Sequence, residues 1–369
     1  MYDIAIVGAG PAGATLARLI GADKRVLLVD RRRLDLDSVE CRLRKPCGGL
    51  LAPAAQKELA RQGLGVPASV IAGPQLFAVR TLDLTARLER LYQRFYVNID
   101  REAFDRWLVS LVPARVDTCF GWNLTGLEPD ADAPTLSFRT AEGGHATVRA
   151  RLVVGTDGAL SAVRRLAYPN DPRPAMYSAV QATFDLASAD PSYGAIFDAE
   201  LTNYYGWTIP KAGQLVVGAA FSAGAGVTGR FEEFVRRLED NGYRLGREVA
   251  RTASAIARPT APGHLLVGRG RILLAGEAAG FISPSSAEGI SFALRSGADL
   301  AHGLSQGIEG APQRYLTAAW PLAIRVGVKA AKASAIYGPT TRRLVMRAGI
   351  GAISVPRGTL PASQLAPDR

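Results

Sequence analysis

The spacing of hydrophobic positions changes several times along the chain, and each change marks an expected element. Apolar runs of strand length occur at residues 2–7, 25–29, 151–156 and 271–275, and helical spacing occurs at residues 53–62, 100–111, 228–242 and 290–304. Residues 75–100 and 173–223 are instead rich in β-branched and aromatic residues, which favours strands. The chain therefore alternates strands with helices near both ends and builds a second sheet between them.

The first thirty residues contain a glycine turn between a strand and a helix. Gly8, Gly10 and Gly13 have G-x-G-x-x-G spacing, and Asp30 ends the next strand. Such glycines allow a tight turn, close approach of a pyrophosphate and close packing of the helix, while the acid accepts hydrogen bonds from a ribose. This context predicts a dinucleotide site. The turn alone leaves flavin and nicotinamide open, since the arginines at 31–33 suit either a 2′-phosphate of NADP or a solvated loop.

Two later turns repeat this arrangement. The strand at 151–156 runs into Asp157-Gly158 and a helix that starts near Ser161, and the strand at 271–275 runs into Gly276-Glu277 and a helix that starts near Gly289. A strand end followed by a helix N-terminus suits a polar, partly anionic ligand. We expect the three turns to converge on one extended molecule.

Composition restricts the class of protein. The length of 369 residues suggests two domains, and 48% hydrophobic with 21% charged residues is an ordinary globular composition. Three cysteines (Cys41, Cys47 and Cys119) are too few for a disulfide framework, which favours a reducing, cytoplasmic setting. No signal peptide and no apolar stretch of bilayer-spanning length are expected.

The net charge of +11 raises the question of nucleic acid or anionic membrane. Arginine is dispersed and no nucleic-acid-binding motif accompanies it, so no nucleic-acid partner is expected. The C-terminal region differs, because basic residues from Arg325 to Arg347 are interleaved with apolar ones. It suits either a helix that covers the domain with a basic face exposed or peripheral contact with a membrane.

Metal and hydrolytic sites are not expected. The three histidines, His145, His264 and His302, have no ligand spacing, and the chain has neither a G-x-S-x-G elbow nor a Walker A loop.

Taken together, the motifs resemble a known family. The three turns resemble the FAD-binding fingerprint of the flavoprotein superfamily that includes para-hydroxybenzoate hydroxylase. Three further segments resemble the geranylgeranyl reductase family and, within it, the CbrA-like branch. They are Lys45-Pro46-Cys47-Gly48-Gly49, Tyr205-x-Trp207-x-x-Pro210-Lys211 and G-E-A-A-G…P…E-G-I from Gly276. The resemblance covers roughly residues 2–300.

The resemblance implies an α/β fold in which a Rossmann-type FAD-binding domain carries an inserted, mostly antiparallel β-sheet domain for the substrate. We expect the FAD-binding domain at residues 1–74, 101–172 and 252–310, and the substrate domain at 75–100 and 173–251. Residues 311–369 would form a C-terminal helical segment.

The resemblance also implies site residues. The expected FAD-binding residues are Gly8, Gly10, Pro11, Ala12, Gly13, Asp30, Arg31, Cys47, Gly48, Gly49, Arg101, Asp157, Gly276, Glu277, Gly289 and Ile290. Glu277 stands where the family usually has an aspartate. The N–H groups of Gly289 and Ile290 would face the flavin pyrimidine edge. With the later turns included, the arginines at 31–33 become loop charges, of which only Arg31 approaches the adenosine.

Cys47, Tyr205 and Trp207 are the candidate catalytic residues. Cys47 would be a proton donor or a polar contact beside the flavin, with packing against the ring as the simpler role, and the two aromatics would line the substrate cavity or belong to an ordinary core. On a strand, Tyr205 and Trp207 share one face.

The implied function is an FAD-dependent oxidoreductase that reduces a C=C bond of a hydrophobic, prenyl-like or polyketide-like substrate. Its electrons would come from NAD(P)H or another reductant, including an electron-donor protein. An FAD-dependent monooxygenase and a non-catalytic flavin-binding partner are the alternatives. Halogenation is disfavoured, because the Trp-x-Trp-x-x-Pro pattern is only half present.

Overall fold

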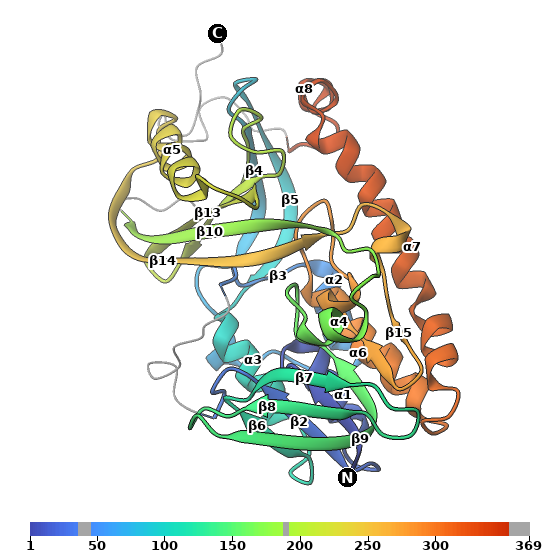
Figure 1. Cartoon of the computed structure of the whole chain (residues 1–369). Helices are drawn as coiled ribbons and strands as arrows, with labels where there is room; N and C mark the ends of the chain where they lie inside the picture. The colour runs from blue at the N-terminus through green and yellow to red at the C-terminus, as the bar shows by residue number, and fades with distance from the viewer. Residues whose placement is uncertain (36–45, 187–191, 354–369) are drawn as a thin grey trace.

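The computed structural model describes residues 1–35, 46–186 and 192–353. Two sheets with helices around them make up this part of the chain, and Figure 1 shows the sheets one above the other. Cys41, Lys45 and the end of the expected C-terminal segment, 354–369, lie outside the described residues.

The first sheet has a parallel centre. Its strand order is β15-β16-β9-β1-β2-β6, and β7 and β8 extend it from β9 as antiparallel strands. The pairs β1–β2, β1–β9, β9–β16 and β2–β6 are parallel, as in a Rossmann-type fold. The strands are β1 (Tyr2–Val7), β2 (Val26–Asp30), β6 (Asp117–Phe120), β7 (Asn123–Glu128), β8 (Thr135–Arg139), β9 (His145–Gly155), β15 (Gly268–Arg269) and β16 (Ile272–Leu274).

The second sheet is mostly antiparallel. Its order is β14-β10-β13-β12-β11-β4-β5-β3, and β11–β4 is a parallel pair. The strands are β3 (Leu50–Leu51), β4 (Leu76–Asp83), β5 (Leu88–Asn98), β10 (Ala175–Leu186), β11 (Tyr193–Phe197), β12 (Gly206–Lys211), β13 (Gln214–Ser222) and β14 (Leu245–Arg258). This arrangement confirms the expected fold class. The domain boundaries given above stay a prediction.

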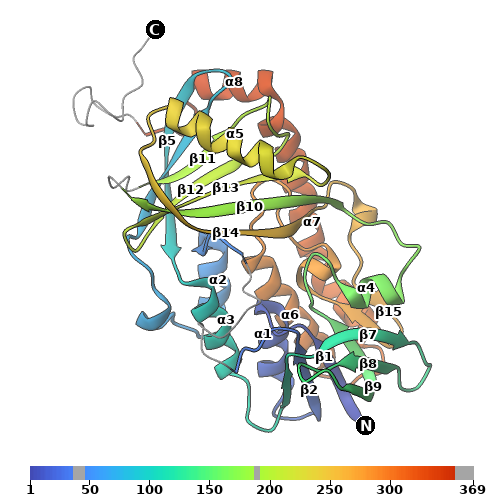
Figure 2. The same ribbon diagram turned by 60° about the vertical axis from the view of Figure 1, so that its left-hand side comes forward.

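Helices cover both sheets. They are α1 (Pro11–Ile20), α2 (Pro53–Arg61), α3 (Arg101–Ser110), α4 (Ala162–Ala167), α5 (Val227–Asp240), α6 (Ile290–Leu304), α7 (Ala311–Tyr337) and α8 (Pro339–Ala348), with 3₁₀ turns η1 (Ala68–Val70), η2 (Pro262–His264) and η3 (Gly276–Ala279). Figure 2 shows α5 on the side of the second sheet that faces away from the first sheet. Phe231, Phe234 and Leu238 of α5 are buried there.

Local sequence explains several helix starts. Asp100 accepts hydrogen bonds from the N–H groups of Glu102 and Ala103, so it caps α3. Ser161 caps α4 by accepting from the N–H of Arg164. Proline occupies the first position of α1 and of α2, where its missing N–H costs nothing.

The C-terminal helices join the two halves of the molecule. In Figure 1, α7 runs along the right-hand side from the level of the first sheet to that of the second, and α8 follows it at the upper end of the second sheet. The buried Arg342 of α8 pairs with Asp83 of β4 at 2.6 Å, which fixes α8 to the second sheet. Among the described residues, no helix has the length and apolar character needed to cross a bilayer.

Candidate functional site

A cavity of about 420 Å³ lies between the helices of the first sheet and the second sheet. This volume is in the usual range for small-molecule sites. It brings together segments far apart in the sequence: the turn before α1, the Cys47 segment, the turns at β9 and β16, and the face of β12. Of the residues expected at the site, those that line the cavity are Gly10, Pro11, Ala12, Cys47, Gly48, Gly49, Arg101, Tyr205, Trp207, Gly276, Glu277, Gly289 and Ile290. Gly8, Gly13, Asp30, Arg31 and Asp157 do not line it.

The glycines of the first turn have different roles. Gly8 has φ +109°, and a Cβ there would overlap the backbone of Thr156; a Cβ at Gly13 would overlap the carbonyl oxygen of Gly8. Gly10 has an ordinary φ of −73° and open space where a Cβ would stand. Gly8 and Gly13 are therefore required by the fold itself, whereas Gly10 leaves room for a ligand at the N-terminus of α1.

Asp30 is held by its own chain. Its Oδ2 accepts from the N–H of Ala9 at 2.8 Å, and Arg32 donates to Oδ1 from its backbone N and Nε and to Oδ2 from Nη2. A carboxylate offers about four acceptor positions. A ribose at Asp30 would therefore share or displace the guanidinium of Arg32.

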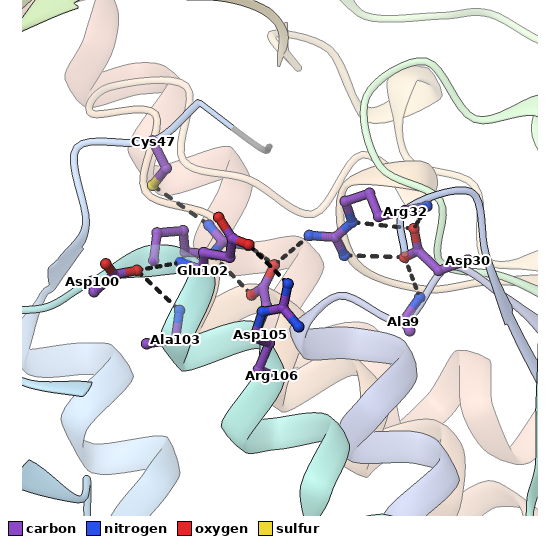
Figure 3. A network of polar contacts seen from close by, with 10 residues as sticks. Ala9, Asp30, Arg32, Cys47, Asp100, Glu102, Ala103, Asp105 and Arg106 are labelled. Atoms are coloured by element: carbon purple, nitrogen blue, oxygen red, sulfur yellow. Dashed lines mark hydrogen bonds and ion pairs between the residues drawn. The ribbon is translucent and has the colours of Figure 1, made fainter. Parts of the chain in front are cut away.

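Arg32 continues a buried charge network (Figure 3). Its Nη1 donates to Oδ2 of Asp105 at 2.7 Å, and Oδ1 of Asp105 accepts from Nε of Arg101 at 2.9 Å. Arg32 and Asp105 are 12% and 1% exposed. The expectation that the arginines after Asp30 are loop charges is wrong for Arg32, because it pairs with two buried carboxylates. Arg31 is exposed.

Arg101 connects this network to Cys47. Its Nη1 donates to Sγ of Cys47 at 3.4 Å, and the N–H of Gly49 donates to the same sulfur at 3.4 Å. Burial lowers the pKa of nearby Lys211, and the charge of Cys47 opposes that shift. The sulfur of Cys47 is therefore held by one guanidinium and one backbone N–H, with the ammonium of Lys211 nearby.

Packing explains the two glycines after Cys47. A Cβ at Gly48 would overlap the side chain of Ile209, and one at Gly49, where φ is +66°, would overlap Nζ of Lys211 and the carbonyl oxygen of Ile99. Nζ of Lys211 donates to the carbonyl oxygens of Gly48 and Ile99 at 2.9 and 2.7 Å. These contacts fix the Cys47 segment against β12, since neither glycine can carry a side chain there.

The second sheet gives the cavity an aromatic wall. Tyr205 and Trp207 pack together with ring centroids 5.7 Å apart, as their expected shared face requires. Burial raises the pKa of Tyr205 well above its ordinary value, and its hydroxyl donates to the carbonyl oxygen of Ser286 at 2.8 Å. Tyr205 is therefore a neutral phenol that positions the turn before α6.

The indole of Trp207 packs against the neighbouring strand β13. It pairs across the sheet with Gly218, and its indole lies where a Cβ of Gly218 would stand. Its Nε1 is buried and has no acceptor among the described residues. Buried donors normally have a partner, so the unpaired indole N–H is a local cost of packing Trp207 against Gly218.

The acids of the other two turns bond to protein. Asp157 accepts from the hydroxyl of Ser161 at 2.5 Å and from the N–H of Ala162 at 2.6 Å, so it caps α4. Burial raises its pKa, and these hydrogen bonds oppose the shift. Glu277 reaches further: its Oε1 accepts from the N–H of Ala257 in β14 at 3.0 Å while the residue lines the cavity.

Several lining residues were missed from the sequence. Arg94, Tyr96, Gln181, Tyr193 and Lys329 also line the cavity. Lys329 carries a sequence signal, because it lies in the basic stretch from Arg325 to Arg347, but this signal does not predict that it lines the cavity. Arg32 and Asp105 were missed because their pairing spans 73 residues.

Comparisons with known proteins place the chain. No family model matches it. It is 38% identical to protein CbrA of Escherichia coli strain K12 over 355 residues, which cover 95% of this chain and 98% of that protein. The chain belongs to the CbrA family. This result agrees with the resemblance to the CbrA-like branch that the three motif segments indicated.

Solved structures show how the fold of the CbrA family relates to others. A geranylgeranyl bacteriochlorophyll reductase-like protein, Ta0516 of Thermoplasma acidophilum, superposes with a TM-score of 0.76 at 20% identity and covers 93% of this chain and 90% of its own. PqsL of Pseudomonas aeruginosa, a probable FAD-dependent monooxygenase, gives 0.67 at 19% identity, with 95% and 99% covered. Both have the fold expected from the sequence, which is of the para-hydroxybenzoate hydroxylase type.

Proposed function

We propose that the chain is an FAD-dependent oxidoreductase that most readily reduces a C=C bond of a hydrophobic, prenyl-like or polyketide-like substrate. The observation that carries this proposal is the single cavity in which the turn before α1, the polar Cys47 and the aromatic face of β12 meet. The fold that the chain shares with Ta0516 and PqsL supports it.

The residues present fit FAD. Gly10 leaves open space at the start of α1, and Gly289 and Ile290 stand at the start of α6, so two helix N-termini offer N–H groups to anionic parts of the cofactor. Arg101 supplies a buried positive charge to the same cavity. Bound FAD, once reduced, supplies the hydride of N5, while the protein supplies orientation and a dry cavity.

The wall of the cavity fits an apolar substrate. Tyr96, Tyr193, Tyr205 and Trp207 present aromatic surface, and Ile209 and Ile256 add aliphatic surface. This part of the lining is apolar and suits a largely hydrophobic molecule.

Cys47 is the proposed source of the proton. Its thiol lines the cavity, and after it releases a proton the sulfur lies beside Nη1 of Arg101 and the N–H of Gly49. Both donors stabilise the negative charge that remains. Saturation of a C=C bond needs one hydride and one proton, and Cys47 meets the second need from within the cavity.

NAD(P)H or another reductant, including an electron-donor protein, would reduce the cofactor. An FAD-dependent monooxygenase is the second candidate, supported by the fold shared with PqsL. A flavin-binding protein without catalysis is the third.

The test is spectroscopic. The protein is purified or reconstituted with FAD, reduced without oxygen, and mixed with geranylgeraniol as a prenyl probe or with a polyketide-like probe. If the flavin is reoxidised without oxygen and the product contains two hydrogen atoms more than the added probe, the result supports the reductase. Oxygen uptake that matches an oxygenated product shows the monooxygenase instead, and failure to bind FAD at all contradicts the proposal.

A further inference from the structure

Helix α7 exposes an apolar stripe. Leu316, Trp320, Ile324 and Val328 follow one another at four-residue steps and are between 51% and 65% exposed. Residues at this spacing lie along one face of a helix. The side that faces the protein is opposite and is buried through Tyr315, Ala319, Leu322, Val326 and Ala333.

Helix α8 and the residue after it also expose apolar side chains. Leu344 and Val345 are 63% and 48% exposed, and Ile350 is 68% exposed. Scattered exposed apolar residues are ordinary on a protein surface, but a contiguous apolar patch marks an interaction site. We call Leu316, Trp320, Ile324, Val328, Leu344 and Val345 the apolar stripe.

The charge around the stripe has one sign. Residues 311–348 contain seven Arg and Lys residues and no Asp or Glu. Arg314 and Arg342 are used inside the protein, where they bond to backbone carbonyls and to Asp83. Lys332, Arg343 and Arg347 are exposed beside the stripe, so the surface is complementary to an anionic partner.

The same helix reaches the cavity. Lys329 follows Val328 directly and lines the cavity, and burial lowers its pKa. Further along, Tyr337 donates from its hydroxyl to the carbonyl oxygen of Ser285, in the turn that leads to α6. Helix α7 thus exposes the apolar stripe on one face and contributes Lys329 to the cavity from another.

We propose that α7 and α8 dock the protein on an anionic lipid surface, with the apolar stripe in the boundary between headgroups and acyl chains. A helix lies in this plane when one face is apolar and its flanks are basic, and tryptophan favours the same depth. The stripe of α7 spans about 18 Å at 1.5 Å per residue, which is enough for a helix parallel to the surface. Docking in this way places the cavity next to the phase in which a hydrophobic substrate dissolves.

Vesicle cosedimentation tests the proposal. The whole protein is mixed with phosphatidylcholine vesicles that contain phosphatidylglycerol, or with pure phosphatidylcholine vesicles. We expect binding to the anionic vesicles that weakens as salt is added. Trp320→Ser together with Ile324→Ser should lower the partition about tenfold or more, because apolar area that enters the boundary is lost. Lys332→Gln with Arg343→Gln should lower it on anionic vesicles alone.

Matched controls lie on β14, where Val249 is 48% exposed and Arg247 is 82% exposed. Val249→Ser and Arg247→Gln should leave vesicle binding unchanged. Unchanged binding by the Trp320/Ile324 variant overturns the proposal. The proposal is also overturned if the wild type self-associates, the Trp320/Ile324 variant does not, and neither protein binds vesicles. The stripe would then join two copies of the chain. Because vesicle binding needs neither FAD nor a substrate, the result is independent of the proposed redox function.

Discussion

Nη1 of Arg101 lies 3.4 Å from Sγ of Cys47 and donates to it. If Cys47 delivers the proton, Cys47→Ala should lower the turnover number roughly a hundredfold, the ordinary contribution of a general acid. FAD should remain bound, because the residue does not form the turn before α1. Steady-state assays and the flavin absorbance measure the two effects.

Cys119 provides the control for this substitution. It is a partly buried thiol on β6 of the first sheet, and it does not line the cavity. Cys119→Ala should leave turnover unchanged. Undiminished turnover in Cys47→Ala would return Cys47 to a packing role.

We expect protonation of Asp105 at low pH to lower the free energy of unfolding. Burial alone would raise its pKa, but Arg101 and Arg32 more than offset this and hold the pKa below its ordinary value. A carboxyl with a lowered folded-state pKa stabilises the protein above its unfolded pKa of about 4, and this stabilisation is lost as the pH falls through the folded value. Denaturant unfolding at several pH values measures it.

Asp105→Asn removes this contribution. The variant should lose about 3–5 kcal/mol at neutral pH, because two buried guanidinium groups lose a partner. Its stability should also fall less steeply than that of the wild type below about pH 4. Parallel pH profiles for the two proteins would show that Asp105 does not carry the acid dependence.

Gly49 should tolerate no side chain. Gly49→Ala places a methyl group against Nζ of Lys211 and the carbonyl oxygen of Ile99, at φ +66°. Gly63 has nearly the same φ, +68°, but open space around it. Gly63→Ala should cost about 1 kcal/mol from the backbone alone, and Gly49→Ala about 2 kcal/mol more from the overlap. Equal losses in chemical denaturation would contradict the packing described at the Cys47 segment.

Much of the fold follows from local sequence. The caps at Asp100 and Ser161 act on helices only a few residues away, so their chemistry was readable without a structure. The same holds for the shared face of Tyr205 and Trp207, which depends only on strand alternation. Strong local patterns of this kind set the order of the elements.

The details of the site depend on distant parts of the chain. The side chain of Asp157 caps α4 although its motif indicates a ligand, because Ser161 and the first N–H groups of that helix compete for the carboxylate. Arg32 is buried only because Asp105, 73 residues later, reaches it. Lys329 meets the cavity only through the packing of α7. Local sequence patterns do not predict these long-range contacts.

The claim that FAD occupies this cavity is tested most directly by Gly10→Ala. Gly10 has an ordinary φ and open space at its Cβ position, so the folded protein without cofactor should keep its stability. A methyl group there would fill space that a bound pyrophosphate would need at the N-terminus of α1, so we predict that the FAD dissociation constant, measured by flavin fluorescence titration, rises about tenfold or more. Unchanged FAD affinity in Gly10→Ala, or no FAD binding by the wild type, would contradict the account.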